Sequence, residues 1–288
     1  MDMAEMNEAT EHDGDGGVAG NGKSKAGRDR RSMLSIMRSR AYIYELIRRR
    51  GAPSVNALKE IIYPTYDPKN SRSQGTSSVP DLDKHMRGER AVTNQMLNLA
   101  SQIPVQATAR RVFEIGPEEG QGNVPLWAIF EDRFEEFDEI IEAGLRLSKP
   151  GSDLGLSRAD RVALLFLPAD QWHQLRTSPG VAGGPNLAQR AYDAGYFAAD
   201  VLRLATAIAF WRLCLRGADE WGPMEALLDW LLIGPYAGVI AALGISEEIR
   251  DLLRMIAEDH HIQQGNVTAA ARALTRFGMD GKRADPFG

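Results

Sequence analysis

NLAQRAYDAGYFAADVLRLATAIAFWRLCL is the sequence of residues 186–215. From Val201 onward apolar residues occupy almost the whole circumference of a helix, and Gly217 follows them. A helix that is apolar all round is buried, and a glycine just past its last residue is a common stop signal. The stretch therefore predicts one long helix from Asn186 to about Leu215, at the centre of a helical bundle.

Aromatic and aliphatic residues before this stretch recur at helical spacing. Steps of three or four residues separate Phe130, Phe134, Phe137, Ile141 and Leu145. Such spacing places side chains on one face, so these residues predict a single helix with one buried stripe.

Capping residues and helix breakers delimit the remaining helices of the bundle. Ser157 and Asp160 have the spacing of a capping box, and Pro168 limits the helix that they start. A helix opening at Pro223 must bend or break at Gly234-Pro235, and Ser246 is the predicted cap of the next. With a last helix from Asn266 through Phe277, the bundle covers residues 126–278, and 279–288 form a polar tail.

The first hundred residues read as a polar tail and a smaller helical domain. Residues 1–30 contain almost no large apolar side chains, so we predict a disordered tail. Helices are expected over 31–50, 53–62, 79–87 and 91–102, with a loop at 64–80. These helices would form a domain spanning 31–104. Residues 105–125 would be a connector, mostly loop, in which 112–115 could form one short strand.

Charge is strongly segregated in the tail and the helix after it. Residues 1–22 contain six acids and no Lys or Arg, whereas residues 23–50 contain ten bases and two acids. A basic segment behind an acidic tail indicates a region that meets a polyanion, or a tail that masks such a region. An equally good interpretation is a solvated linker whose two halves attract each other.

Within residues 81–100, two short stretches together form a motif: His85-Met86-Arg87-Gly88-Glu89-Arg90 and Met96-Leu97-Asn98-Leu99-Ala100. About residues 53–103 resemble the lambda-repressor-like (XRE-type) helix-turn-helix domain, in which a recognition helix leads into a Gly-containing turn and a Leu-x-x-Leu-Ala helix. The resemblance implies binding in the major groove of DNA. In the alternative interpretation, Gly88 simply connects two packed helices.

The candidate nucleic-acid-binding residues come from this resemblance and from the basic segment. The resemblance implies base or phosphate contacts for Ser77, Ser78, Lys84 and Arg87. The basic segment and the turn add further cations that could contact phosphates, namely Arg30, Arg31, Arg38, Arg48, Arg49, Arg50 and Arg90.

Other residue clusters favour structural roles. The seven acids between Glu131 and Glu142 surround the Phe stripe as a solvated face would, although paired carboxylates could also bind a metal. The run Glu258-Asp259-His260-His261 holds elements of a metal or acid–base site, but adjacent helical residues point about 100° apart. Cys214, the only cysteine, lies in an apolar helix as an inert buried thiol would.

These patterns favour a cytoplasmic protein without cofactor or metal. A single cysteine gives no internal disulfide, the N-terminus lacks a secretory signal, and we expect a buried hairpin, not a membrane span, over 226–245. No motif for a phosphate-binding loop, a dinucleotide or a nucleophilic serine occurs, so we expect no enzyme.

The preferred function is a DNA-binding regulator whose bundle forms a homo-oligomer or binds a protein partner. This hypothesis predicts salt-sensitive DNA binding that weakens when Arg48, Arg49 and Arg50 become Ala. A scaffold that binds only proteins is the alternative, with interface anchors among Trp172, Trp211, Trp221 and Trp230. A metal-dependent enzyme is a third possibility.

Overall fold

The computed structural model describes residues 30–63, 81–101, 108–148, 155–179, 186–217 and 221–266. The regular structure in these ranges is helical except for a hairpin of β1 (Glu118–Glu119) and β2 (Gly122–Asn123), so the all-α prediction is confirmed. Several predicted segments lie outside the described residues: the tail before Arg30, the loop at 64–80, the last helix through Phe277 and the polar tail at 279–288.

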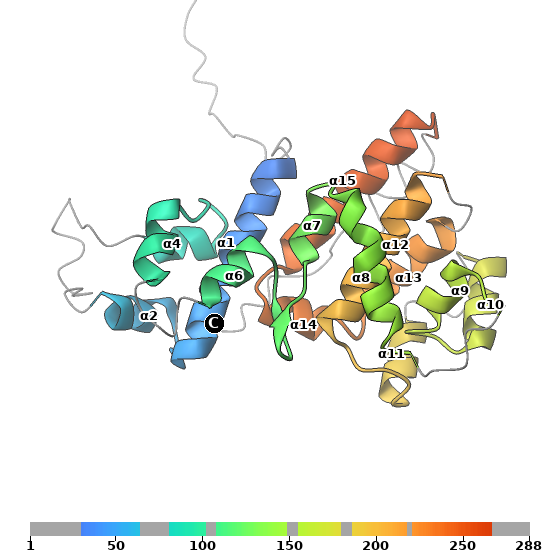
Figure 1. Ribbon diagram of the computed structural model, residues 1–288, viewed down its shortest axis with the longest axis horizontal. Coiled ribbons are helices and arrows are strands. Elements are labelled where there is room, and N and C mark those ends of the chain that lie inside the picture. The colour runs from blue at the N-terminus through green and yellow to red at the C-terminus, as the bar shows by residue number, and fades with distance from the viewer. Residues whose placement is uncertain are drawn as a thin grey trace, which may run out of the picture.

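Helix α12 (Val201–Leu215) is the centre of the bundle, as its apolar circumference predicts. Helix α8 (Phe137–Leu145) packs along it so closely that a Cβ on Gly144 would lie 1.8 Å from Oγ1 of Thr206. Helices α7 (Leu126–Phe130), α9 (Arg158–Ala163) and α13 (Trp221–Ile233) also pack on α12. Figure 1 shows these helices grouped in one half of the molecule.

The bundle also contains the shorter helices α10 (Ala169–Thr177), α11 (Leu187–Asp193) and α14 (Ala237–Ala242) and the longer helix α15 (Ser246–Gln263). Among the described helices, none has both the length and the apolar character needed to cross a membrane.

Five of the described helices form the other half of the molecule (Figure 1). They are α1 (Arg30–Arg50), α2 (Val55–Ile62), α3 (Leu82–Met86), α4 (Asn94–Ser101) and α6 (Ala109–Glu114). Gly51, with a φ of +58°, ends α1 as predicted, and the Ser54 hydroxyl accepts a hydrogen bond from Ala57 N at the start of α2.

Helix α1 belongs to two hydrophobic cores. Met33, Leu34, Met37 and Ala41 in its first half are part of the core of the bundle. Side chains of its second half form a smaller core with α2, α3, α4 and Ala109 of α6; they are Tyr42, Ile43, Leu46 and Ile47. Most residues of this helix are buried, so α1 is an interior helix that contributes side chains to both cores.

Two predicted continuous helices are wrong. The helix expected from Asn186 ends at Asp193, because Gly195 takes a φ of +72° and Asp200 caps a new helix at Val201. The Phe stripe is divided among α7, the 3₁₀ turn η1 (Phe134–Glu136) and α8, because Asp132 takes a φ of +61°. Periodicity alone does not detect such breaks, since the apolar spacing continues across them.

The possible strand at 112–115 is also wrong. These residues lie in or next to α6, whose Ala109 and Val112 are one turn apart and buried, and α6 packs on α1. Ser246 is the first residue of α15, where no side chain caps the helix. By contrast, the Ser157–Asp160 capping box and the break at Gly234 are confirmed.

Candidate functional site

Asp132 lies where the first turn of α1 meets the turn between α7 and η1. Its carboxylate accepts a hydrogen bond of 2.7 Å from Arg30 and another from Arg212 of α12, whose side chain is 5% exposed. Arg212 also donates to the Ile129 carbonyl. Burial raises the pKa of Asp132, but the two guanidinium groups outweigh burial and leave this pKa below its ordinary value.

A cavity of about 700 Å³ opens beside this carboxylate. Residues of α1 and of the segment at the end of α7 line it, namely Arg30, Leu34, Ser35, Arg38, Phe130, Glu131, Asp132 and Arg133. Glu131 accepts from Arg38 and lies 3.1 Å from Arg133, which is also 2.8 Å from Glu136. Each arginine of this cavity is therefore already paired with a carboxylate of the chain.

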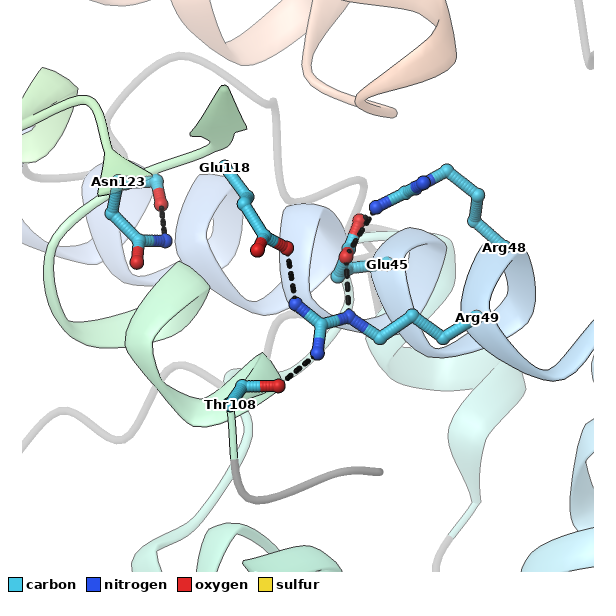
Figure 2. Close-up of polar contacts among 7 residues, drawn as sticks. Glu45, Arg48, Arg49, Thr108, Glu118 and Asn123 are labelled. Atoms are coloured by element: carbon cyan, nitrogen blue, oxygen red, sulfur yellow. Dashed lines mark hydrogen bonds and ion pairs between the residues drawn. The ribbon is translucent and has the colours of Figure 1, made fainter. Parts of the chain in front are cut away.

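The arginines in the second half of α1 are paired in the same way. Nε of Arg49 donates to Glu45 at 2.5 Å and its terminal nitrogens donate to Glu118 and Thr108, which ties α1 to β1 and to the start of α6 (Figure 2). Arg48 donates to Glu45 at 2.7 and 2.9 Å, although its side chain is 67% exposed. In the middle of α1, Arg40 lies 2.6 Å from Glu248 of α15, and both side chains are largely buried.

The cations of α3 and the turn after it have acidic neighbours. Lys84 lies 2.8 Å from Asp81, Arg87 lies 2.7 Å from Glu89, and Asp83 is paired with Lys59 of α2. Arg90 is exposed, and its carbonyl lies 3.0 Å from Nδ1 of His85.

The remaining candidate residues add little to these groups. The side chain of Arg50 is partly buried at the end of α1. Ser77, Ser78 and the side chain of Arg31 lie outside the described residues.

The structure therefore distributes the predicted cations over three places. Arg30 and Arg38 face α7, and residues 48–50 form the end of α1. Gly88, beside Arg87, packs on Ile36 and Arg40, and Arg40 is about 12 Å along the axis from Arg48. The resemblance of residues 53–103 to a helix-turn-helix domain stays a prediction.

The acids from Glu131 to Glu142 divide into two sets. Glu135, Asp138, Glu139 and Glu142 are exposed, as expected of a solvated face. Glu131 and Asp132 are exposed too, but they also bind the arginines of α1 and α12. Among the described residues, no three His, Cys, Asp or Glu side chains are arranged to hold a metal ion.

The two adjacent histidines have different surroundings. Nε2 of His261 lies 3.4 Å from Glu225 of α13, and both side chains are 2% exposed. His260 is less buried and lines a cavity of about 340 Å³ together with His261, Trp221 and Cys214. The prediction that Cys214 is buried is confirmed, but this thiol borders a cavity instead of packing only against apolar neighbours.

The tryptophans named as possible interface anchors are mostly part of the core. Trp172, Trp211 and Trp230 are buried, and Trp221 is partly buried against the two histidines. These positions are therefore not the exposed aromatic surface that a protein-binding module requires.

An exposed apolar surface lies instead around α11. Tyr192, Tyr196 and Ile233 are 39%, 45% and 45% exposed. A Cβ added to Gly234, next to Ile233, would lie 3.3 Å from the side chain of Gln189, and Gln189 is one helical turn from Tyr192. Sequence analysis missed this surface because it placed both tyrosines inside a long buried helix, although Gly195 was a signal for a turn.

Comparisons of the chain with protein-family models, with curated proteins and with solved structures found no match.

Proposed function

We propose that this chain is a helical protein-interaction module that binds a partner through the surface formed by Tyr192, Tyr196 and Ile233. The main support is the exposure of two tyrosines four positions apart, Tyr192 in the last turn of α11 and Tyr196 in the turn that follows it. Tyrosine gives a large contact area at a small cost in conformational entropy and is enriched at protein interfaces.

The segment that contains both tyrosines, the end of α11 and the turn after it, is anchored, so the surface is preorganised. The next residue along the chain, Phe197, is buried, and its ring lies 5.7 Å from the Tyr192 ring and 6.4 Å from the stacked ring of Tyr236. Tyr196 reaches the carbonyl of Leu164 at 3.5 Å. A surface that does not need to be ordered on binding loses less affinity to entropy.

Carboxylates beside the tyrosines indicate the chemistry of the partner. Asp193 follows Tyr192 and is exposed, and the charge of Asp170 acts on Tyr196, whose pKa is raised first by burial and then by this charge. A lysine or arginine can contact a tyrosine face and a carboxylate together. We therefore expect a protein segment that combines a basic residue with apolar side chains.

The state of the arginines supports this proposal over binding to duplex DNA. Arg30, Arg38, Arg40 and Arg49 are each paired with a carboxylate of another element. Contacts to phosphate would have to replace these pairs, and the cations lie in three separate groups. An interaction module needs none of them on its binding surface.

A peptide panel tests the proposal. Synthetic twelve-residue peptides that combine arginine with leucine or valine would be titrated against the full chain, each beside a matched peptide with glutamate in place of arginine. We expect some arginine peptides to bind and their glutamate counterparts not to bind. Tyr192→Ala with Tyr196→Ala should weaken binding about tenfold or more, in line with the loss expected for central interface residues.

The matched control is Ile61→Ala, which removes an equally exposed apolar side chain from α2. This variant should bind as the wild type does. Binding that survives the tyrosine substitutions, or that does not distinguish arginine from glutamate, would remove the basis of the proposal.

A further inference from the structure

The cavity of about 700 Å³ between the first half of α1 and the end of α7 has a volume typical of small-molecule sites. Arg30, Leu34 and Arg38 recur every four residues, so they lie on one face of α1, and residues 130–133 form the other wall. The cavity shares no residue with the partner-binding surface at α11. It therefore offers a site that is independent of the proposed function.

The arginines of this cavity keep donors that the chain does not use. Arg30 and Arg38 make their side-chain hydrogen bonds through Nη2. Arg133 contacts Glu131 through Nε at 3.1 Å and Glu136 through Nη1 at 2.8 Å. Nη1 of Arg30, Nη1 of Arg38 and Nη2 of Arg133 thus make no hydrogen bond within the described part of the chain, and none of the three atoms is buried. Guanidinium donors of this kind suit a carboxylate.

Asp132 keeps an unused acceptor in the same place. Arg30 and Arg212 both donate to Oδ1, so Oδ2 accepts no hydrogen bond from the residues that the structure describes. The side chain is 47% exposed, so a ligand can reach this carboxylate. Among the described residues other than glycine, only Asp132 has a positive φ. Backbone strain of this kind is concentrated at ligand sites.

The unused donors and the unused acceptor lie close together. Nη2 of Arg30 is 2.7 Å from Oδ1 of Asp132, so one unused nitrogen and the unused oxygen belong to the same ion pair. A purely anionic ligand would meet the carboxylates of Glu131 and Asp132 here, and a purely cationic ligand would meet three guanidinium groups. A ligand with both charges on neighbouring atoms avoids both repulsions.

The rest of the lining indicates the body of such a ligand. Leu34 and Phe130 give the cavity an apolar part, and its volume leaves room for a large side chain. We propose that the cavity binds a free α-amino acid with a large apolar side chain. The carboxylate of the ligand accepts hydrogen bonds from the three arginines, its ammonium group donates to Oδ2 of Asp132, and its side chain packs on Leu34 and Phe130.

Isothermal titration calorimetry of the full chain tests the proposal with phenylalanine, leucine and tryptophan. Two analogues of phenylalanine each lack one charge: 3-phenylpropionate has no ammonium group, and 2-phenylethylamine has no carboxylate. We expect at least one of the amino acids to bind, and each analogue to bind about tenfold more weakly than phenylalanine or worse, because a charged hydrogen-bonding group is lost. If none of the amino acids binds with a Kd below about 1 mM, or if an analogue binds as tightly as phenylalanine, the proposal is wrong.

Two substitutions separate a role in binding from a role in folding. Arg133→Gln removes a half-exposed donor and should weaken phenylalanine binding about tenfold. Asp132→Asn should abolish the preference for phenylalanine over 3-phenylpropionate, whereas a folding defect would weaken both ligands equally. The control Arg158→Gln removes a similarly exposed arginine of α9 and should bind as the wild type does. A folded Asp132→Asn variant that keeps the wild-type preference would refute the contact of the ammonium group with Asp132.

Discussion

The guanidinium group of Arg30 lies 2.7 Å from the carboxylate of Asp132, although 102 positions separate the two residues in the chain. This contact joins the first residue of α1 to the turn between α7 and η1. Further along α1, Arg38 reaches Glu131, Arg40 reaches Glu248 and Arg49 reaches Glu118. The basic residues of this helix therefore connect it to several other elements of the fold.

Replacing Asp132 by Asn tests how much the contacts of its carboxylate stabilise the fold. Asn tolerates the positive φ of the position but leaves the buried Arg212 without a carboxylate partner. Because water reaches the half-exposed Asp132 side chain, we expect a loss of about 1–3 kcal/mol in the free energy of unfolding, below the value for a fully buried pair. Urea unfolding measures this loss.

The matched control is Asp138→Asn, which also removes a carboxylate that pairs with an arginine. Asp138 is 72% exposed beside Arg158, so the change should stay below about 1 kcal/mol. Equal losses for the two variants would contradict the structural role of Asp132.

Acid should weaken the fold through the same carboxylate. The pKa of Asp132 is lower in the folded chain than its ordinary value of about 3.9. A lowered pKa contributes stability that is fully present above the unfolded pKa and is lost as the pH falls through the folded pKa. We therefore expect the free energy of unfolding to fall below about pH 4, less steeply in Asp132→Asn than in the wild type. Parallel curves for both chains would contradict this expectation.

The pair of Arg40 and Glu248 lends itself to a double-mutant cycle. Their side chains are 15% and 10% exposed and lie 2.6 Å apart. Arg40→Met leaves a buried carboxylate without its partner and should cost about 3 kcal/mol in urea unfolding. Adding Glu248→Met should recover most of this loss, because an apolar pair replaces a buried ion pair at little cost. Additive losses would show that the two residues are not coupled.

Two glycines in helices should respond to alanine in opposite directions. Gly238 of α14 has open space around it, so Gly238→Ala should stabilise the fold by about 0.5–1 kcal/mol through helix propensity. Gly144 of α8 faces Thr206 of α12, and a Cβ there would overlap Oγ1. Gly144→Ala should therefore destabilise by about 1–3 kcal/mol or more despite the same propensity gain. Thermal unfolding of both variants provides the comparison.

Local signals predicted much of the fold from the sequence. The apolar run after Val201, the Ser157–Asp160 box and Gly51 each act within one or two helical turns, and the structure has each of them as predicted. The sequence pattern did not predict the breaks at Asp132 and Gly195. Partners distant in the chain determine the backbone at Asp132, and Gly195 lies in a turn within a continuing apolar pattern.

The candidate site was harder to predict for a physical reason. Sequence shows that α1 carries many arginines, but it does not show which carboxylates meet them. Glu131, Asp132 and Glu248 are about 90 to 210 positions away from their partners. A basic helix that binds phosphates and one that pairs internally have the same composition, so only the tertiary structure separates them.

Duplex titration tests the role of these arginines most directly. Fluorescence anisotropy of a labelled 30-base-pair DNA would be followed during addition of the full chain at about 50 mM salt, where phosphate contacts are strongest. Since Arg30, Arg38, Arg40, Arg48 and Arg49 of α1 are each paired with a carboxylate of the chain, we predict no saturable binding by the wild type. Saturable binding that weakens with salt and is lost when Arg48, Arg49 and Arg50 become Ala would contradict this account.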